Sequence, residues 1–150
     1  MNVMHKLFDS AHNNLVSEIQ NADEASLDIQ PEGFGNNIHW HAGHVLTINE
    51  MLLFGFPDQS SHLPDNYNDL FGNGSSPADW PENVPSVKEL TNQLQDQLER
   101  MKQIPESQFN NKLDKPILGA ETFGELAAVA MTHESNHTGR INAIKKAIAK

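Results

Sequence analysis

Cysteine is absent from this sequence of 150 residues. Its absence excludes disulfide bonds, thiolate metal ligands such as those of zinc fingers, and a catalytic cysteine. Basic residues are scarce as well, since ten Lys and Arg stand against twenty Asp and Glu, which gives a net charge of −10 at pH 7. Because non-specific nucleic-acid binding depends on Lys and Arg that neutralise phosphates, this balance argues against a nucleic-acid partner.

Long apolar runs are also missing. No stretch approaches the ~18 apolar residues of a membrane-spanning helix, and the opening segment MNVMHKLFDSAHNN lacks the apolar core of a signal peptide. We therefore expect a soluble, cytoplasmic protein without a membrane partner. The length predicts one domain over residues 1–150, and a hydrophobic content of 37% predicts an economical core with long polar connections around it.

Four segments repeat apolar residues at steps of three and four, the period of an amphipathic helix, and none alternates convincingly as a strand. Capping-box pairs open the last two segments: Ser86 with Glu89, and Thr122 with Glu125. The predicted helices lie over residues 4–21, 36–54, 86–104 and 122–148, and the second is expected to close at Gly55, Phe56 and Pro57. Four amphipathic helices of this length predict an all-α four-helix bundle.

Two connections are long. Residues 57–85 contain five prolines, a GNGSS turn and the aromatic residues Tyr67, Phe71 and Trp80. Connections longer than about 12–15 residues are uncommon in compact domains and are often functional. This one is either a crossover between two parallel helices, which gives the order up-down-down-up, or a crossover that also walls a site. Within the second connection, residues 105–120, the segment LDKPILGAE is a candidate for a short extended piece.

Five of the eight histidines lie in two short clusters. His133 and His137 are four apart on the last predicted helix, in stripe positions that aliphatic residues hold before and after them. A single imidazole there is usually a hydrogen-bonded structural histidine, but two adjacent ones must both lose water and find partners. A divalent metal ion offers each a strong partner, and residues four apart stack on one helix face.

The second cluster, NIHWHAGH, opens the second predicted helix. His41 and His44 share a face, whereas His39 points elsewhere and is expected to be exposed or packed beside Trp40. If the second and fourth helices are neighbours, either His41 or His44 completes a three-histidine site that leaves a coordination position open. Imidazole ligands suit zinc, nickel, copper or iron, so the residues alone do not name the metal.

Residues 133–137 also match H-E-x-x-H, in which two histidines bind zinc and the glutamate is the general base of a metalloprotease. The metzincin continuation needs Gly and His where this chain has Arg140 and Ala143. A metallohydrolase is thus an alternative that the missing continuation weakens.

The segments NIHWHAGHVLTINE and THESNHTGRI, with the lead-in TFGEL at residues 122–126, resemble the DinB/YfiT-like superfamily over essentially the whole chain. The resemblance implies a metal-binding bundle with one histidine from the second helix and an H-x-x-x-H pair from the fourth. The family's second-helix ligand follows the tryptophan by four positions and maps onto His44, while the pair maps onto His133 and His137. His41 then becomes a neighbour that hydrogen-bonds to a ligand or faces the open cavity.

The resemblance also implies an activity. Characterised members are thiol-dependent transferases and isomerases that use bacillithiol, mycothiol or glutathione-like cosubstrates. It therefore implies a metal-dependent transferase with a small-molecule thiol, an electrophilic substrate, a divalent metal ion (zinc or nickel, with iron or manganese as alternatives) and a homodimeric state. A non-catalytic metal- or ligand-binding stress-response module remains an alternative, because a fold does not deliver an activity.

Four polar residues near the clusters are candidates for supporting roles. Glu134 is a candidate general base, an acceptor for an imidazole N–H, or a surface acid. Asn36 and Asn136 are candidate positioning residues. Arg140 is expected either to meet a substrate carboxylate or to stay solvated while it neutralises the helix dipole.

Overall fold

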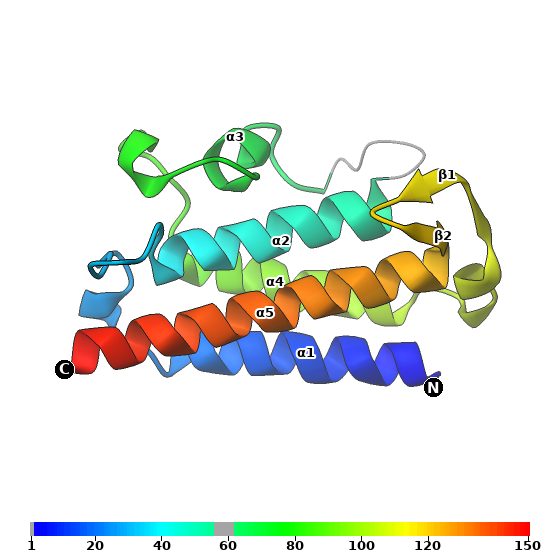
Figure 1. Ribbon diagram of the computed structural model, residues 1–150, viewed down its shortest axis with the longest axis horizontal. Helices are drawn as coiled ribbons and strands as arrows, with labels where there is room; N and C mark the ends of the chain where they lie inside the picture. Colours follow the sequence, from blue (N-terminus) through cyan, green and yellow to red (C-terminus); the bar gives the residue numbers. More distant parts are fainter. Residues whose placement is uncertain (1, 56–61) are drawn as a thin grey trace.

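The structure, a computed structural model, describes residues 2–55 and 62–150. Four long helices run side by side, with short helical turns and a two-stranded hairpin in their connections (Figure 1). In chain order the helices and strands are α1 (Val3–Gln20), α2 (Ile38–Phe54), α3 (Tyr67–Phe71), α4 (Val87–Lys102), β1 (Lys112–Ile117), β2 (Ala120–Thr122) and α5 (Phe123–Ala149), with 3₁₀ turns at Glu24–Ser26, Pro77–Asp79 and Glu106–Asn110. The predicted all-α bundle is confirmed.

The sequence predicts capping boxes at the starts of α4 and α5, and the structure shows both hydrogen bonds of the box at α5 and the one that Ser86 accepts at α4. The hydroxyl of Ser86 accepts a hydrogen bond from the backbone N–H of Glu89 at 3.1 Å. At the start of α5, Thr122 accepts from the N–H of Glu125 at 3.1 Å, and the Glu125 carboxylate accepts from the N–H of Thr122 at 2.9 Å. Each cap satisfies N–H groups that the first helical turn leaves without an intrahelical partner.

The bounds of α2 differ slightly from the prediction. The helix begins at Ile38, because Asn37 is its N-cap and accepts a hydrogen bond from the backbone N–H of Trp40 at 2.8 Å. It ends at Phe54. Gly55 is the C-cap as expected, whereas the predicted role of residues 56–57 in closing the helix lies outside the described residues.

Side-chain contacts establish the directions of the helices. Along two helix pairs the contacting residue numbers rise together, so each pair is parallel. His12 contacts Glu134 and Glu18 contacts Lys145, which joins α1 to α5. His39 contacts Pro85, just before α4, and Glu50 contacts Arg100 within α4, which joins α2 to α4. Between α2 and α5 the contacting residue numbers run in opposite senses (Figure 1). The order is therefore up-down-down-up, and the connection after α2 is a crossover between parallel helices.

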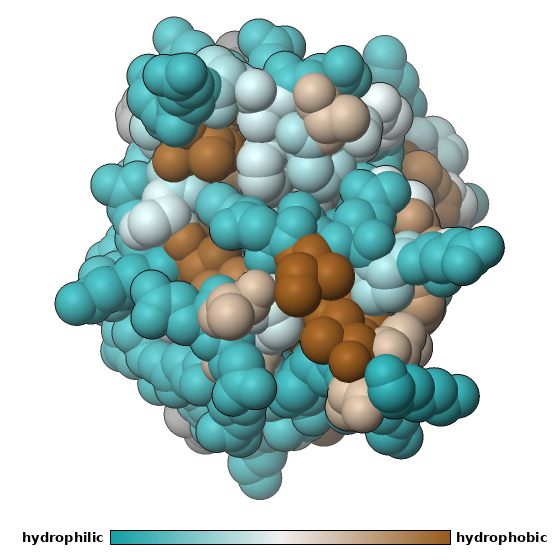
Figure 2. Space-filling view, turned by 90° about the vertical axis from the view of Figure 1, so that its left-hand side faces the viewer, coloured by the Kyte–Doolittle hydropathy of each residue, from teal (hydrophilic) through white to brown (hydrophobic). Residues whose placement is uncertain are grey.

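The core is divided into two apolar clusters along the bundle. On α5 the first cluster ends at Met131 and the second begins at Ile141, and on α1 they meet between Ala11 and Leu15. Buried polar side chains occupy the level between them. The end of the bundle where α1 and α5 finish presents a largely hydrophilic surface, with a few apolar residues exposed near the middle of the face (Figure 2).

The crossover covers α2, which is buried along almost its whole length. Within the crossover, α3 presses Phe71 against the helix at Gly43, where an added Cβ would overlap the phenyl ring. Indole N–H groups fasten the same segment: Trp40 donates to the hydroxyl of Ser75 at 2.9 Å, and Trp80 donates to a carbonyl oxygen of α3 at 2.8 Å. The crossover is therefore packed onto the face of α2 that carries the second histidine cluster.

The second connection contains the expected extended piece. β1 and β2 form an antiparallel hairpin in which Ile117 pairs with Ala120. The two turn residues, Leu118 and Gly119, have φ values of 51° and 83°, and a type I′ hairpin turn requires positive φ at both positions. Within the described ranges, no helix is both long and apolar enough to cross a membrane.

A pair of glycine substitutions tests the packing of the crossover. Gly43→Ala is expected to destabilise the protein by about 1–3 kcal/mol, because the new methyl group overlaps Phe71 in a closely packed interface. Gly139→Ala is the matched control: this exposed position in α5 has no atom within 4 Å of an added Cβ, so alanine is expected to stabilise the helix by about 0.5–1 kcal/mol. Urea unfolding measures the free energy of unfolding of both variants, and equal changes would contradict the close approach of α3 to α2.

Candidate metal centre

Three histidines from two helices meet at one point. Each of His44 on α2 and His133 and His137 on α5 offers a ring nitrogen within 4.8 Å of the others. Nε2 of His133 lies 3.2 Å from Nε2 of His44 and 3.0 Å from Nε2 of His137. We call these three residues the histidine trio.

The folding of α2 and α5 explains why the trio forms. His133 and His137 are one turn apart on α5 and so project from the same face. The antiparallel packing of α2 against α5 then brings His44 to the same height. Two residues of the trio are buried and His133 is half-buried, so the trio lies close to the surface between the two helices rather than at the centre of the core.

The crossover fixes the ring of His44. Its Nδ1 is 2.7 Å from the carbonyl oxygen of Phe71. A carbonyl only accepts hydrogen bonds, so Nδ1 carries the hydrogen and Nε2 is left with a lone pair. Trp40 stacks on the other side of the imidazole, with ring centroids 4.3 Å apart and planes 13° apart. The crossover thus walls the site, the second of the two roles that the sequence left open.

His41 lies next to the trio. Its Nδ1 is 2.9 Å from Nδ1 of His137, the ring nitrogen that faces away from the trio. When Nε2 of His137 carries a lone pair, Nδ1 of the same ring donates its hydrogen to His41. Of the two residues that the sequence offered as partners for the α5 pair, His44 joins the trio and His41 contacts it from behind.

Burial keeps all four imidazoles neutral. Loss of water lowers the pKa of His41 and of His133 to about 4, with further lowering by the neighbouring His44 and by Arg140. The pKa of His137 falls to about 2, for the same first reason and because the other histidines surround it. Desolvation also lowers the pKa of His44. Metal binding requires neutral imidazole, so these rings are ready to act as ligands at pH 7.

The ring nitrogens of the trio cannot all be satisfied by hydrogen bonds to one another, and their lone pairs fit a cation. The lone pair at Nε2 of His44 faces His133, and a hydrogen on Nε2 of His133 can satisfy only one of its two neighbours. Nδ1 of His133 is also buried and has no hydrogen-bond partner within the described part of the chain. The nitrogen separations of 3.0 and 3.2 Å are close to the ~3.3 Å expected between ligands of a tetrahedral site with bonds of 2.0–2.1 Å.

Glu134 does not face the trio. Its side chain is fully buried, with carboxylate oxygens 2.9 and 2.8 Å from Nδ1 of His12 and 2.7 Å from the amide nitrogen of Asn49. The interpretation as a surface acid is therefore wrong. Glu134 pairs with the imidazole of His12 on α1 rather than with that of a metal-ligand histidine, so the interpretation as an acceptor for the N–H of a ligand is also wrong. Its place in the core also removes the general base that the H-E-x-x-H interpretation needs.

The environment of His39 also differs from the prediction. It is buried rather than exposed, and the aromatic ring beside it is that of Trp80, 4.7 Å away, rather than Trp40. Its ring nitrogens lie 2.7 Å from the carboxylate of Asp28 and 2.7 Å from the carbonyl oxygen of Pro85. His39 therefore ties the start of α2 to the segments before and after it.

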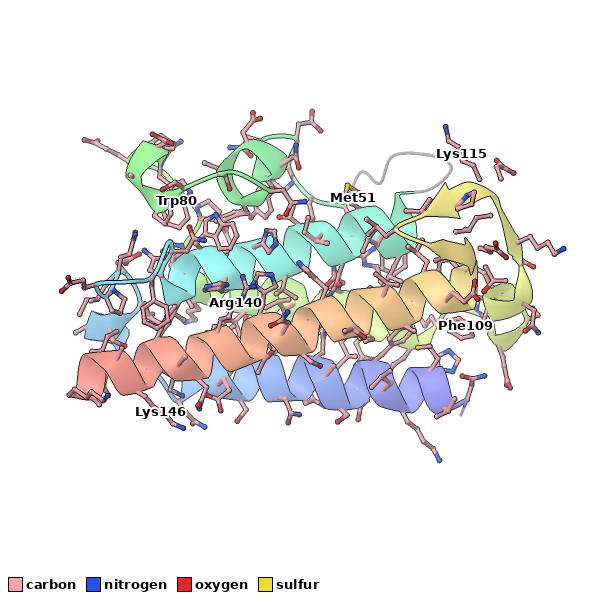
Figure 3. All side chains as sticks on the ribbon, viewed as in Figure 1. Met51, Trp80, Phe109, Lys115, Arg140 and Lys146 are labelled. Carbon is pink, nitrogen blue, oxygen red and sulfur yellow. The ribbon has the colours of Figure 1, made fainter. Side chains whose placement is uncertain are left out.

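The remaining candidates lie at the edge of the site. Arg140 is exposed and points into the space between α2 and α5 (Figure 3), where its charge helps to lower the pKa of each histidine of the trio. Asn136 is exposed and Asn36 is half-buried. Neither asparagine hydrogen-bonds to the trio within the described ranges.

His12 is a buried residue near the site for which the sequence predicted no role. A signal existed, because Phe8, His12, Leu15 and Ile19 follow one another at steps of four, three and four along the apolar stripe of α1. A lone histidine in such a stripe is usually structural, and its partner lies 122 residues away on α5.

Comparison with known proteins identifies the family. No curated protein matches the chain. The sequence profile of the DinB superfamily matches residues 7–141, a range that includes α2 and α4, most of α1 and α5, and every residue of the trio. The bundle with its crossover and the histidines of α2 and α5 agree with the resemblance seen in the sequence, and the chain belongs to the DinB superfamily.

Proposed function

We propose that the protein binds a divalent metal ion through Nε2 of His44, His133 and His137, and that it is a metal-dependent transferase acting on a small-molecule thiol. The observation that carries the metal site is the convergence of three neutral imidazole nitrogens at 3.0 and 3.2 Å. Three protein ligands leave a coordination position open, which is typical of catalytic rather than structural sites. We propose zinc or nickel, both of which suit imidazole ligands, with iron or manganese as alternatives.

A bound divalent cation would hold a coordinated thiol in its deprotonated, nucleophilic form. The protein's own residues prepare the site for that chemistry. The carbonyl of Phe71 holds the ring of His44, and His41 accepts from His137. Because the chain contains no cysteine, the thiol must arrive as a cosubstrate of the bacillithiol type. Its sulfur would form a bond to an electrophilic carbon of the second substrate while a leaving group departs from that carbon with the bonding electron pair. Thiols stay reduced in the cytoplasm, where we place the protein.

Arg140 is the residue that we assign to substrate recognition. It lies seven residues beyond His133 on α5, so the two side chains share a face. Arg140 is exposed and makes no ion pair with the residues that the structure describes. An unpaired guanidinium beside an open coordination position suits a carboxylate carried by the thiol or by the electrophile.

A non-catalytic metal- or ligand-binding module is the second candidate, supported by the closure of the site under α3 and Trp40. In that case the metal ion serves stability and no thiol reaches it. The homodimer implied by the family remains a prediction, which sedimentation analysis tests. A metallohydrolase loses support because Glu134 is bound to His12 in the core.

Titration of the cobalt-substituted protein with thiols distinguishes the first two candidates. Mercaptoacetate is expected to change the visible absorption of cobalt, because its sulfur enters the open position. Arg140→Leu is expected to weaken this binding about tenfold, the effect of losing one charge-assisted hydrogen bond. 2-Mercaptoethanol, which lacks the carboxylate, is the control and is expected to bind both proteins equally. A cobalt spectrum that no thiol changes would exclude the transferase and favour the non-catalytic module.

A further inference from the structure

A layer of buried polar side chains crosses the middle of the bundle, and the proposed metal chemistry does not use it. Each long helix contributes one fully buried member: His12 from α1, Asn49 from α2, Gln97 from α4 and Glu134 from α5. The layer lies where the two apolar clusters meet and separates one from the other.

Hydrogen bonds give the members of this layer fixed orientations. The amide nitrogen of Gln97 donates to the carbonyl oxygen of Leu46 at 3.0 Å and to Oε1 of Glu50 at 3.1 Å. The amide oxygen of Gln97 therefore faces His12 at 3.1 Å from Nε2, and this ring nitrogen donates. Nδ1 of the same ring lies 2.9 and 2.8 Å from the carboxylate oxygens of Glu134. The imidazole thus ties α4 to α5.

Asn49 adds a constraint from α2. Its amide nitrogen donates to Oε1 of Glu134 at 2.7 Å. The carboxylate on α5 is therefore held by α1 on one side and by α2 on another. Because hydrogen bonds weaken steeply with distance and angle, a rotation or an axial shift of α5 breaks both contacts.

The part of α5 that carries two residues of the trio depends on this carboxylate. Between Met131 and Ile141, the buried residues of this fully described helix are Glu134 and His137 alone. Apolar packing thus holds the two ends of the stretch, and a hydrogen-bonded side chain holds its middle. Since one residue corresponds to about 100° of helix rotation, a slip by one position would carry both histidines of α5 out of the trio.

We propose that the His12–Glu134 pair, braced by Asn49 and Gln97, is a positioning device that fixes the rotation and height of α5 so that its two histidines meet His44. This inference rests on the proposed metal site, because the geometry that it sets is that of the three ligands. Replacing a buried ion pair by apolar residues of similar volume is often neutral or stabilising. Buried polar groups are better known for selecting one register among alternatives.

The test compares thermal stability with cobalt affinity in two variants. Glu134→Leu leaves the imidazole of His12 without its partner and is expected to lower both. His12→Leu/Glu134→Leu removes both partners and is expected to regain most of the lost stability, while cobalt affinity stays at least about tenfold below that of the wild type. A double variant that regains full cobalt affinity along with its stability overturns the proposal, since a merely structural pair predicts that result.

His5→Leu is the matched control. His5 is also a buried histidine of α1, with its Nε2 2.7 Å from the carbonyl oxygen of Ile104, but it ties α1 to the end of α4 rather than to α5 and does not contact the polar layer. The control is expected to change stability while cobalt affinity stays at the wild-type level. An equal loss of cobalt affinity in the control overturns the proposal, because any polar defect in the bundle would then weaken the site.

Glu134→Gln separates hydrogen-bond geometry from charge and serves if the leucine variants do not fold. The glutamine amide can donate to a neutral Nδ1 of His12, while its oxygen accepts from Asn49. Because the hydrogen bonds of this side chain to His12 and Asn49 are kept, we expect wild-type cobalt affinity. A loss as large as that of Glu134→Leu overturns the positioning role.

Amide NMR spectra of the metal-free proteins provide a readout that does not depend on the metal. His12→Leu/Glu134→Leu is expected to broaden or double the signals of residues 131–141, whereas the control variant keeps one set. If the wild-type protein binds no cobalt, the proposed function is wrong, but the NMR comparison of the metal-free proteins still tests the positioning role. One undisturbed set of signals in the double variant overturns the positioning proposal.

Discussion

Replacing His137 with alanine is expected to weaken zinc or cobalt binding by more than about 100-fold. Partners that merely orient a metal ligand typically change affinity 10–100-fold, and removal of a ligand should exceed that range. The nitrogen of His137 is one of three that converge in the trio. Burial lowers the pKa of this imidazole to about 2, so the ring is neutral at pH 7. Competition with a chromophoric chelator measures the affinity.

The comparison with His41 makes this prediction specific. His41 is just as buried, but it contacts the far nitrogen of His137 rather than the point where the trio converges. His41→Ala is therefore expected to cost 10–100-fold, less than His44→Ala or His137→Ala. If His41→Ala abolishes binding while His44→Ala retains it, the ligand assignment on α2 is wrong. Thermal unfolding of each metal-free variant controls for loss of fold.

Local signals explain why the helices could be predicted from the sequence. The capping residues Ser86 and Thr122 act within four residues of the chain, and the structure shows the hydrogen bond that each of their side chains accepts. The parallel pairing of α2 with α4 followed from the length of the crossover, which has to return along the bundle. The two-residue error at the start of α2 arose because Asn36 and Asn37 are both good N-caps and only one of them can take that position.

The site was predictable only as far as helix geometry extends. A separation of four residues places His133 and His137 on one face whatever surrounds them. The choice between His41 and His44 depends instead on the rotation of α2, which packing across the crossover sets through Phe71. The residues alone left that choice open, and the family resemblance favoured the residue that the structure places in the trio.

The burial of Glu134 could not be predicted from the residues of its own helix. Its position beside His133 gave no indication that the side chain turns into the core, because its partners lie on α1 and α2, 122 and 85 residues away in sequence. The stripe of α1 contained the complementary residue, His12. A buried acid and a buried histidine each need a hydrogen-bond partner, and each provides the other's partner when the two pair across different helices.

Removing the metal ion is expected to lower the unfolding temperature of the protein by about 10 °C. A ligand that binds only the folded state adds RT ln(1 + [L]/Kd), which is about 4 kcal/mol at a free concentration 1,000 times Kd. For a chain of 150 residues, each kcal/mol corresponds to about 2–4 °C. The trio exists only in the folded chain, because it joins residues that are 89 positions apart in sequence. Calorimetry with and without a chelator measures the shift.

The His137→Ala variant is the control for that shift. It lacks one nitrogen of the trio but keeps the rest of the bundle, so zinc is expected to raise its unfolding temperature little or not at all. An equal gain in the wild type and the variant would place the stabilising ion elsewhere on this acidic protein, whose net charge is −10. No gain in the wild type would mean that the folded trio does not bind the metal. Because α2 and α5 each contribute histidines to the trio, a bound ion would cross-link the two helices that the crossover and the polar layer already hold in register, and its binding energy would add directly to their packing.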